Sequence, residues 1–483
     1  MASRTTQDLR NCGSVTDTTL PAPLSRAVDH ARRFLPSLAE RPLTTDASFG
    51  VLVTALGGPL PEAGADPAGV IDELASTASR GVLSTAGPRY FGFVTGGAYP
   101  VAVAADWLVA TWDQNAALHV MSPAMSAIEA VTSRWILEVF DLPRDASVGF
   151  VTGAHTANVT ALAAARDEVL RQHGWDVEAR GLQGAPTVTV LAGAEAHASI
   201  AAATRMLGLG ADTIVRIPSD EQGRIRADAV APLLASFEGP RIVCAQAGNV
   251  NTGACDPFEA IAAVTRAHGA WLHVDGAFGL WAAASPAYRH LVNGVALADS
   301  WTTDAHKWLN VTYDSGIVIV AHPSAHRAAM SQSAAYLTPA SNAERDGMDW
   351  TPEASRRGRV VPVYAVFRAL GRAGLADLVD RCCRLASRMA GRLSEADGVR
   401  VLNDIVLNQV LVRFESDRGE NITSAVIGGV QREGTCWCGP TGWQGQPAMR
   451  ISVSNWSTTA ADIDRSAKAI LAVHAKIRSQ SGA

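Results

Sequence analysis

The sequence predicts an α/β protein with a large domain built on a mainly parallel sheet and a smaller C-terminal α+β domain. First, its 483 residues are 48% hydrophobic and 18% charged, which is typical of a globular protein. Second, short β-rich runs alternate with helical stretches between about residues 90 and 320, as in βαβ units. Third, chemically distinctive polar residues directly follow several of these runs, where α/β proteins bind ligands.

The chain is predicted to have three parts. Residues 1–85 mix proline, threonine and short helical patterns such as 24–35, and we expect an N-terminal helical arm without a core of its own. Residues 86–325 are predicted to form the large α/β domain. Residues 326–483 are predicted to contain a polar loop, at about 331–349, and the small C-terminal domain.

Six runs rich in β-branched and aromatic residues are predicted to be strands of the large domain. They cover residues 148–152, 187–191, 242–245, 271–274, 300–303 and 317–320. Apolar residues recur at helical spacing from Leu162 to Leu170, directly after the glycine-containing turn 152–156. We therefore expect the site to begin at this turn. Residues 401–414 and 449–453 are predicted to be strands of the small domain.

Charge and composition exclude several classes of partner. The 41 basic and 46 acidic residues give a net charge of -5, so no basic excess is available for nucleic acid or an anionic membrane surface. No uninterrupted apolar stretch reaches the roughly 18 residues that a membrane span needs, and the opening residues lack the apolar core of a signal peptide. The seven thinly spread cysteines predict no disulfide framework. We expect a cytoplasmic protein.

Lysine is unusually rare, because only Lys307, Lys468 and Lys476 accompany 38 arginines. A desolvated lysine can lose its proton and form a Schiff base with a carbonyl, whereas arginine stays protonated. Drift from a codon-biased ancestor would explain the scarcity of lysine, but not the position of Lys307 just after a predicted strand. This lysine is therefore a candidate catalytic residue.

Further candidate residues follow the other predicted strands. Asp275, in WLHVDGAFG, ends a buried strand, where an unpaired carboxylate would cost several kcal/mol, so we expect a cation to face it. The turn in VTGAHTANVTAL opens a helix whose free N–H groups could hold a phosphate. His197, in GAEAHASIAAA, begins another helix. Each feature alone is more often structural than functional.

Together these features match the needs of pyridoxal 5′-phosphate. This cofactor requires a lysine for its Schiff base, a carboxylate that keeps the pyridine nitrogen protonated, and a phosphate cradle. A flat imidazole over the ring would complete the set.

The two close thiols, Cys436 and Cys438, lack a second Cys or His pair nearby, so we expect no metal site.

From about residue 88 to the C-terminus the chain resembles the group II pyridoxal-phosphate-dependent decarboxylases, the aromatic-L-amino-acid and glutamate decarboxylase family. The matching stretches are VTGAHTANVTALAAAR, AEAHASI, NVNTGACDPFEAI, HVDGAFG, DAHKWL and DWTPEASRRGRVVPVYAVFRALGRAGL. The resemblance is specific because these motifs are several, ordered and correctly spaced. It implies the aspartate aminotransferase fold, fold type I, and a homodimer whose active sites lie at the subunit interface.

The resemblance also implies roles for individual residues. Lys307 would form the Schiff base, Asp275 would face the pyridine nitrogen, and His197 would stack on the ring with Ala277 on the opposite face. The other cofactor-binding residues would be Gly153, Ala154, His155, Asp304 and His306, around the phosphate, and Thr252, near the cofactor's hydroxyl side. His155 stands where many relatives have a hydroxyl donor, and a ring N–H can serve instead.

The substrate is less well defined. Segment 91–97, with Phe93, is smaller and more flexible than the aromatic and proline-rich substrate wall of the aromatic-amino-acid decarboxylases, so substrate identity does not transfer. Arg450 is a candidate anchor for a substrate carboxylate, although a structural ion pair is the ordinary role of an arginine. The resemblance places a catalytic tyrosine at Tyr336, 29 residues after Lys307, and its phenol could donate a proton.

The expected activity is that of a carboxy-lyase, which releases CO₂ from an L-amino acid joined to pyridoxal phosphate and leaves the amine. Tyr336 favours this over an aldehyde synthase, because phenylalanine at that position accompanies aldehyde formation in the family. An aldehyde synthase, an aminotransferase or a carbon–carbon lyase on the same fold is the first alternative. A pyridoxal-phosphate-binding protein without catalytic activity is the second.

Overall fold

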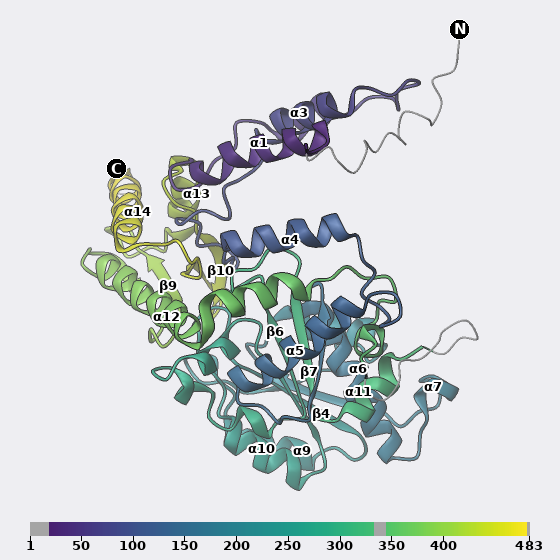
Figure 1. The fold of residues 1–483 in the computed structure, drawn as a ribbon. Helices are drawn as coiled ribbons and strands as arrows, with labels where there is room; N and C mark the ends of the chain where they lie inside the picture. Colours follow the sequence, from purple (N-terminus) through teal and green to yellow (C-terminus); the bar gives the residue numbers. More distant parts are fainter. Residues whose placement is uncertain (1–18, 333–343, 481–483) are drawn as a thin grey trace, which may run out of the picture. The chain divides into compact units, whose positions relative to one another are not determined.

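The computed structural model describes residues 19–332 and 344–480, and the chain divides into two compact units, residues 1–84 and 85–483 (Figure 1). The described part of the first unit contains helices α1 (Ala22–Ser37), α2 (Phe49–Leu56) and α3 (Pro67–Ala78). None of these helices contains a buried residue. An ion pair between Arg26 of α1 and Asp72 of α3 joins two of them, with Nε 2.8 Å from Oδ2.

The second unit is organised around a seven-stranded sheet with the order β1-β7-β6-β5-β4-β2-β3. Its strands are β1 (Ser147–Val151), β2 (Thr189–Gly193), β3 (Val215–Ile217), β4 (Arg241–Gln246), β5 (Trp271–Asp275), β6 (Ser300–Asp304) and β7 (Gly316–Val320). Only β7 runs antiparallel to its neighbours. The mainly parallel sheet is confirmed, and it brings the carboxyl ends of β4, β5 and β6 to one edge.

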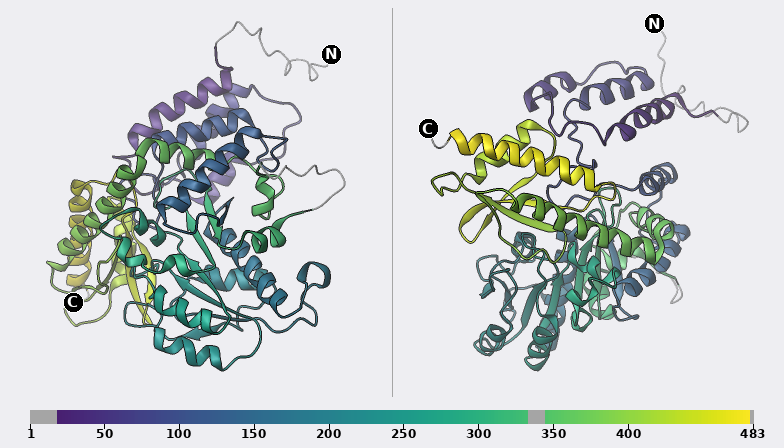
Figure 2. Two further views of the ribbon diagram at one scale, coloured as in Figure 1. Left: turned by 60° about the horizontal axis from the view of Figure 1, so that its bottom comes forward. Right: turned by 90° about the vertical axis from the view of Figure 1, so that its left-hand side faces the viewer.

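Apolar residues bury both faces of this sheet, because successive residues of a strand point to opposite faces. Val243 belongs to one core, together with residues of α5, α10 and α12, and the adjacent Ile242 belongs to another, together with residues of α6 and α8. Figures 1 and 2 show helices on either side of the sheet. The fold is thus an α/β layer structure in which strands β1, β5, β6 and β7 are buried along their whole length.

Helices connect the strands and cover the sheet. In chain order they are α4 (Pro100–Trp112), α5 (Pro123–Val139), α6 (Ala154–Gln172), α7 (Val177–Arg180), α8 (Ala198–Met206), α9 (Ala227–Ala235), α10 (Phe258–Ala267), α11 (Pro323–Met330) and α12 (Val360–Ser394). Short 3₁₀ turns cover Gly279–Ala284, Arg289–Val292, Val295–Leu297 and Gly347–Trp350. Helix α6 begins directly after β1, as the pattern from Leu162 to Leu170 predicts.

The C-terminal part forms a four-stranded antiparallel sheet with the order β10-β11-β9-β8. Its elements are β8 (Val399–Val401), β9 (Gln409–Phe414), α13 (Thr423–Glu433), β10 (Gly439–Trp443), β11 (Gln446–Ser452) and α14 (Ala460–Gln480). Helix α14, in yellow, lies alongside α12, in green (Figure 2). The expected α/β fold with a small C-terminal α+β part is confirmed.

One strand prediction in this part is wrong, because within 401–414 a loop separates Val401, the last residue of β8, from β9. The side chain of Asn403 lies in this loop and ties it to neighbouring backbone. It donates hydrogen bonds to the backbone oxygens of Gln409, at 3.0 Å, and of Thr252, at 2.9 Å. The sequence analysis also missed β3 and β10, which are short edge strands.

A buried ion network ties α5 to the segment that precedes α12. Glu129 accepts from Arg356 at 2.6 Å and from Arg345 at 3.0 Å, and Arg356 also donates to the backbone oxygen of Phe150, at the end of β1. Burial acts to raise the pKa of Glu129, but the two arginines outweigh it and hold the pKa below its usual value. The glutamate is therefore ionised and holds two buried cations.

Replacing Glu129 with glutamine should destabilise the fold by about 3 kcal/mol, because both arginines would keep their charge without a counter-ion. Chemical denaturation would measure the change in the free energy of unfolding. Glu138→Gln is a matched control, since Glu138 pairs with Arg372 on the surface and its loss should cost less than about 1 kcal/mol. Equal effects of the two substitutions would contradict the assignment.

Candidate active site

A cavity of about 280 Å³ lies at the carboxyl ends of β4, β5 and β6. It is lined by Gly153, Ala154, His155, His197, Ser199, Gln246, Gly248, Val250, Asp275, Ala277, Phe278, Asp304, His306 and Lys307. Nine of these are residues that the sequence analysis proposed for cofactor binding. They come from separate segments of the chain, and the parallel sheet brings them together.

Lys307 follows β6 and extends toward the last residue of that strand. Its Nζ lies 2.9 Å from Oδ2 of Asp304. The other oxygen, Oδ1, accepts a hydrogen bond of 2.6 Å from the backbone N–H of Ala154. The carboxylate therefore fixes both the lysine amine and the start of α6.

Asp275 is 6% exposed at the end of β5. Its Oδ2 accepts from Asn158 at 3.0 Å and from Ser199 at 3.2 Å, and its Oδ1 accepts from the backbone N–H of Ala277 at 3.1 Å. Within residues 19–332 and 344–480, no arginine, lysine or histidine forms an ion pair with it. The cation expected from the sequence is not a protein side chain, and a protonated pyridine nitrogen fits the position.

His197 caps the N-terminus of α8. Its Nδ1 accepts from the backbone N–H of Ser199 at 3.2 Å and lies 2.8 Å from the hydroxyl of Ser199. Nδ1 is therefore an acceptor, and a proton on the neutral ring belongs at Nε2. Desolvation is the main cause that lowers the pKa of His197. A neutral, flat ring at the cavity can stack on a pyridine ring.

The first turn of α6 can hold a phosphate. Its N-cap is Gly153, which has no side chain to occupy the free N–H groups of the turn. A Cβ atom at this position would lie 3.3 Å from Cε1 of His306. His306 accepts from the backbone N–H of Ser315 through Nδ1, and burial is the main cause that lowers its pKa. Its Nε2 can therefore donate to an anion.

The other predicted site residues lie outside the lining of this cavity. Thr252 is fully buried and its hydroxyl donates to the backbone oxygen of Gln222 at 2.7 Å, so its cofactor role stays a prediction. Phe93 is 61% exposed and its ring centroid lies 5.4 Å from that of Trp437. Tyr336 lies outside the described residues, and its role stays a prediction.

Arg450, on β11, lacks a carboxylate partner within the described part of the chain. Desolvation lowers the pKa of its guanidinium, and its charge contributes to the lowered pKa of His197, so it lies near the cavity. A partly buried arginine without an ion pair is available to an anionic ligand.

The sequence analysis missed several residues of the site. Asn158 and Ser199 bind Asp275. Trp437 stacks on Tyr90 with ring centroids 5.0 Å apart, and Tyr313 stacks on His306. The sequence could have pointed only to Asn158 and Ser199, because these two residues directly follow the two helix starts that the sequence analysis had identified.

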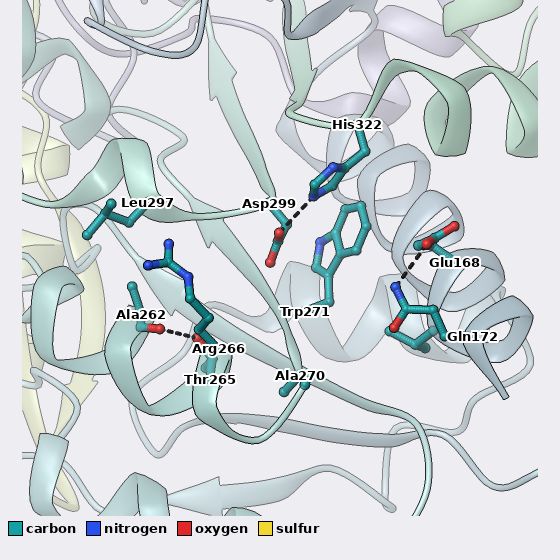
Figure 3. A pocket seen from close by; sticks show the side chains of 12 residues that line it. Glu168, Gln172, Ala262, Thr265, Arg266, Ala270, Trp271, Leu297, Asp299 and His322 are labelled. Carbon is teal, nitrogen blue, oxygen red and sulfur yellow. Dashed lines mark hydrogen bonds and ion pairs between the residues drawn. The ribbon is translucent and has the colours of Figure 1, made fainter.

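A separate cavity of about 270 Å³ lies near the amino end of β5 (Figure 3). His322 pairs with Asp299 at 2.9 Å and packs edge-on against Trp271. Asp299 also accepts from the backbone N–H of Leu272 at 2.7 Å. Several polar groups of this cavity thus bind one another or nearby backbone, and its lining contains none of the predicted cofactor residues.

Comparisons with known proteins agree with this geometry. The pyridoxal-dependent decarboxylase conserved domain matches residues 58–415. An aromatic-L-amino-acid decarboxylase of Bacillus atrophaeus is 25% identical over 451 residues, which are 91% of this chain and 92% of that protein. Tryptophan decarboxylase 2 of Oryza sativa subsp. japonica is 23% identical over 478 residues, 95% of this chain and 93% of that protein.

A crystal structure of Oryza sativa TDC with PLP and tryptamine has the same fold. It has a TM-score of 0.88 at 22% identity and covers 95% of this chain and 98% of that one. The chain belongs to the pyridoxal-dependent decarboxylase family. It is a carboxy-lyase that uses pyridoxal 5′-phosphate.

The cofactor should be attached at Lys307. Borohydride reduction of the cofactor-loaded protein should label this residue, and Lys307→Ala should abolish the label, because no other lysine lies in the cavity lining. Peptide mass spectrometry would locate it. Lys468→Ala, a change on α14, should leave the labelling intact, and a label at Lys468 or Lys476 would exclude Lys307.

Proposed function

We propose that the enzyme decarboxylates an aromatic L-amino acid to the corresponding amine, acting as a cytoplasmic homodimer. The observation that carries the cofactor chemistry is Asp275, a buried carboxylate that lines the same cavity as Lys307 and forms no ion pair with a protein side chain within the described residues. The names of the two relatives support an aromatic substrate. So does the aromatic cluster of Tyr90, Phe93 and Trp437, because such rings favour stacking.

We assign tasks to the polar residues that the cavity brings together. Bound pyridoxal phosphate supplies a ring that accepts the electron pair left when CO₂ departs. Asp275 keeps a proton on the pyridine nitrogen, and Lys307 supplies the amine that attaches the cofactor. His197 restrains the ring by stacking. The first turn of α6 and His306 would hold the phosphate and so restrain the position of the ring.

Arg450 is proposed to bind a carboxylate of the substrate. It lies close enough to His197 to affect its pKa, and its guanidinium has no protein carboxylate to satisfy it among the described residues. Asp304 has a different task. It holds the amine of Lys307 through its Oδ2 atom, at 2.9 Å, and orients it toward the cavity.

Exposed apolar surface supports the homodimer. On α4, Trp107, Leu108 and Trp112 are 47%, 46% and 44% exposed. Within the N-terminal unit, helices α1 to α3 have no buried residue, and Phe49 is 84% exposed. Large exposed apolar side chains that gather on one helix mark interaction surfaces.

The cytoplasmic location is proposed from the cysteines. The described cysteines are all free and buried, as expected in a reducing compartment. Among the described helices, none is long and apolar enough to cross a membrane.

Product analysis tests this function. Purified enzyme loaded with pyridoxal phosphate would be incubated with L-tryptophan, L-tyrosine, L-phenylalanine and the other common L-amino acids, and CO₂, amine, aldehyde and ammonia would be measured. Amine with an equal amount of CO₂ from an aromatic substrate is expected. Aldehyde with ammonia and peroxide would show an aldehyde synthase, and cofactor absorbance without turnover would show a binding protein.

Tyr336→Phe should still release CO₂ but lose most of the amine, because the α-carbon that CO₂ leaves behind needs a proton and phenylalanine has none to give. With oxygen present, aldehyde and ammonia should replace the amine. Chromatographic quantification of both products would measure the change. Tyr288→Phe is the control, and an unchanged amine yield in Tyr336→Phe would remove Tyr336 from the mechanism.

A further inference from the structure

His273 lies in the middle of β5, two residues before Asp275, and does not line the cofactor cavity. It is fully buried, and a buried imidazole without hydrogen-bond partners would be costly. Successive residues of a strand point to opposite faces, so Trp271, His273 and Asp275 share one face of β5. Leu272 and Val274 pack into the core on the other face. A buried strand thus carries three polar groups on one side.

Hydrogen bonds join these side chains into one chain. Ser300, the register partner of His273 on β6, has its hydroxyl 2.9 Å from Nδ1 of the imidazole. The indole Nε1 of Trp271 donates to the same hydroxyl at 2.9 Å. On its other side, Nε2 of His273 lies 3.0 Å from Oδ1 of Asn158, on α6. The chain ends at Asp275, which accepts from Nδ2 of Asn158 at 3.0 Å.

The indole fixes the direction of this chain. Tryptophan is only a donor, so the hydroxyl oxygen of Ser300 accepts from Trp271 and its proton points to Nδ1 of His273. Burial lowers the pKa of His273, which keeps the imidazole neutral. Because Nδ1 accepts, the proton of the neutral ring lies at Nε2. His273 therefore donates to the amide oxygen of Asn158.

Two donors then determine how the amide of Asn158 is turned. An amide has an oxygen on one side and an NH₂ group on the other. Thr302, the register partner of Asp275 on β6, donates to Oδ1 of Asn158 at 2.8 Å, and His273 donates to the same oxygen. The NH₂ group must face the other way, where its two hydrogens bind Asp275 and the hydroxyl of Ser199.

The orientation of this amide affects the basicity of Asp275. A hydrogen bond donated to a carboxylate stabilises its charged form. If the amide of Asn158 were turned round, its oxygen would face the carboxylate instead. Asp275 would then be a stronger base and could take the proton from a pyridine nitrogen beside it.

We propose that Trp271, Ser300 and His273 are positioning residues for the bound cofactor. Through the amide of Asn158, their hydrogen bonds keep the proton between Asp275 and the pyridine nitrogen on the nitrogen, which lets the ring accept electrons. None of the three lines the cofactor cavity, and Trp271 lines the separate cavity of Figure 3. This inference rests on the task proposed for Asp275.

The first measurement is the tautomer of His273. Nitrogen-15 NMR of cofactor-loaded enzyme with labelled histidine should show an unprotonated Nδ1 and a protonated Nε2 at neutral pH. The signals would be assigned by their loss in His273→Gln. Trp271→Phe should admit the opposite tautomer, because the hydroxyl of Ser300 can then turn away. A protonated Nδ1 in the wild type would overturn the proposal.

The second measurement is the proton on the ring, followed by nitrogen-15 NMR of enzyme loaded with cofactor labelled at the pyridine nitrogen. Ser300→Ala interrupts the chain and His273→Leu removes its central donor. Each should lower the ratio of protonated to unprotonated nitrogen about tenfold, the value of one hydrogen bond. His273→Gln, which keeps an N–H group near the position of Nε2, should retain more of the proton than His273→Leu. An unchanged ratio in both Ser300→Ala and His273→Leu would refute the role of the chain.

Trp301→Phe is the matched control for Trp271→Phe. Trp301 is also buried, lies on the neighbouring strand β6, and donates through Nε1 to the backbone oxygen of Val295 at 2.8 Å. Both substitutions remove an indole from the core, but only Trp271→Phe should change the protonation of the ring nitrogen. An equal change in the two variants would mean that loosened packing moves the proton, and the proposal would fail.

These measurements also distinguish this inference from the proposed function. An unprotonated ring nitrogen in the wild type would refute the task of Asp275 and the role of the chain together. A nitrogen that is protonated in the wild type and in every chain variant would refute the chain alone. Neither measurement needs a substrate, so failure to release CO₂ from any L-amino acid would refute the proposed function and leave this test intact.

Discussion

The buried carboxylate of Asp275 is the constraint on which the site depends, and an ordered chain of hydrogen bonds holds it in place. His273 is buried, and burial lowers its pKa to about 4, so its ring is neutral. Its Nδ1 lies 2.9 Å from the hydroxyl of Ser300, and its Nε2 lies 3.0 Å from Oδ1 of Asn158. Thr302 donates to the same amide oxygen at 2.8 Å. The amide nitrogen of Asn158 must then face Asp275.

The resulting geometry explains why a carboxylate can remain in the core without a side-chain cation. Neutral donors satisfy part of its hydrogen-bonding capacity, and the orientation of Asn158 is fixed by groups on β5 and β6. Because removing one partner of a buried charge pair is costly, the bound cofactor and Asp275 stabilise each other. The strands, the start of α6 and Lys307 all meet at this point.

The substrate side of the site is built by segments far apart in the sequence. The backbone N–H of Phe91 donates to Trp437 at 2.9 Å, and the oxygen of Phe91 accepts from Ser452 at 2.9 Å. These bonds join the predicted substrate wall to the C-terminal sheet that carries Arg450. Gly96, five residues along the same segment, packs on Lys307. Movement of the C-terminal sheet would therefore displace segment 91–97, which lies beside the catalytic lysine.

The sequence predicted the catalytic side better than the substrate side for a physical reason. Asp275 and Lys307 each follow an apolar strand, so local pattern alone placed them at one sheet edge. The stacking of Tyr313 on His306 and the pairing of Phe91 with Trp437 depend on how separate segments meet. Edge strand β10 contains Pro440 and pairs with β11. Its strand conformation therefore depends on contacts with β11 rather than on the β-propensity of its own residues.

The most direct test of this account is the protonation state of the cofactor's pyridine nitrogen. Nitrogen-15 NMR of the enzyme loaded with labelled pyridoxal phosphate would distinguish the protonated from the unprotonated ring. The account predicts a protonated nitrogen across the neutral pH range in the wild type and an unprotonated one in Asp275→Asn. An unprotonated nitrogen in the wild type, or a proton retained in Asp275→Asn, would contradict it.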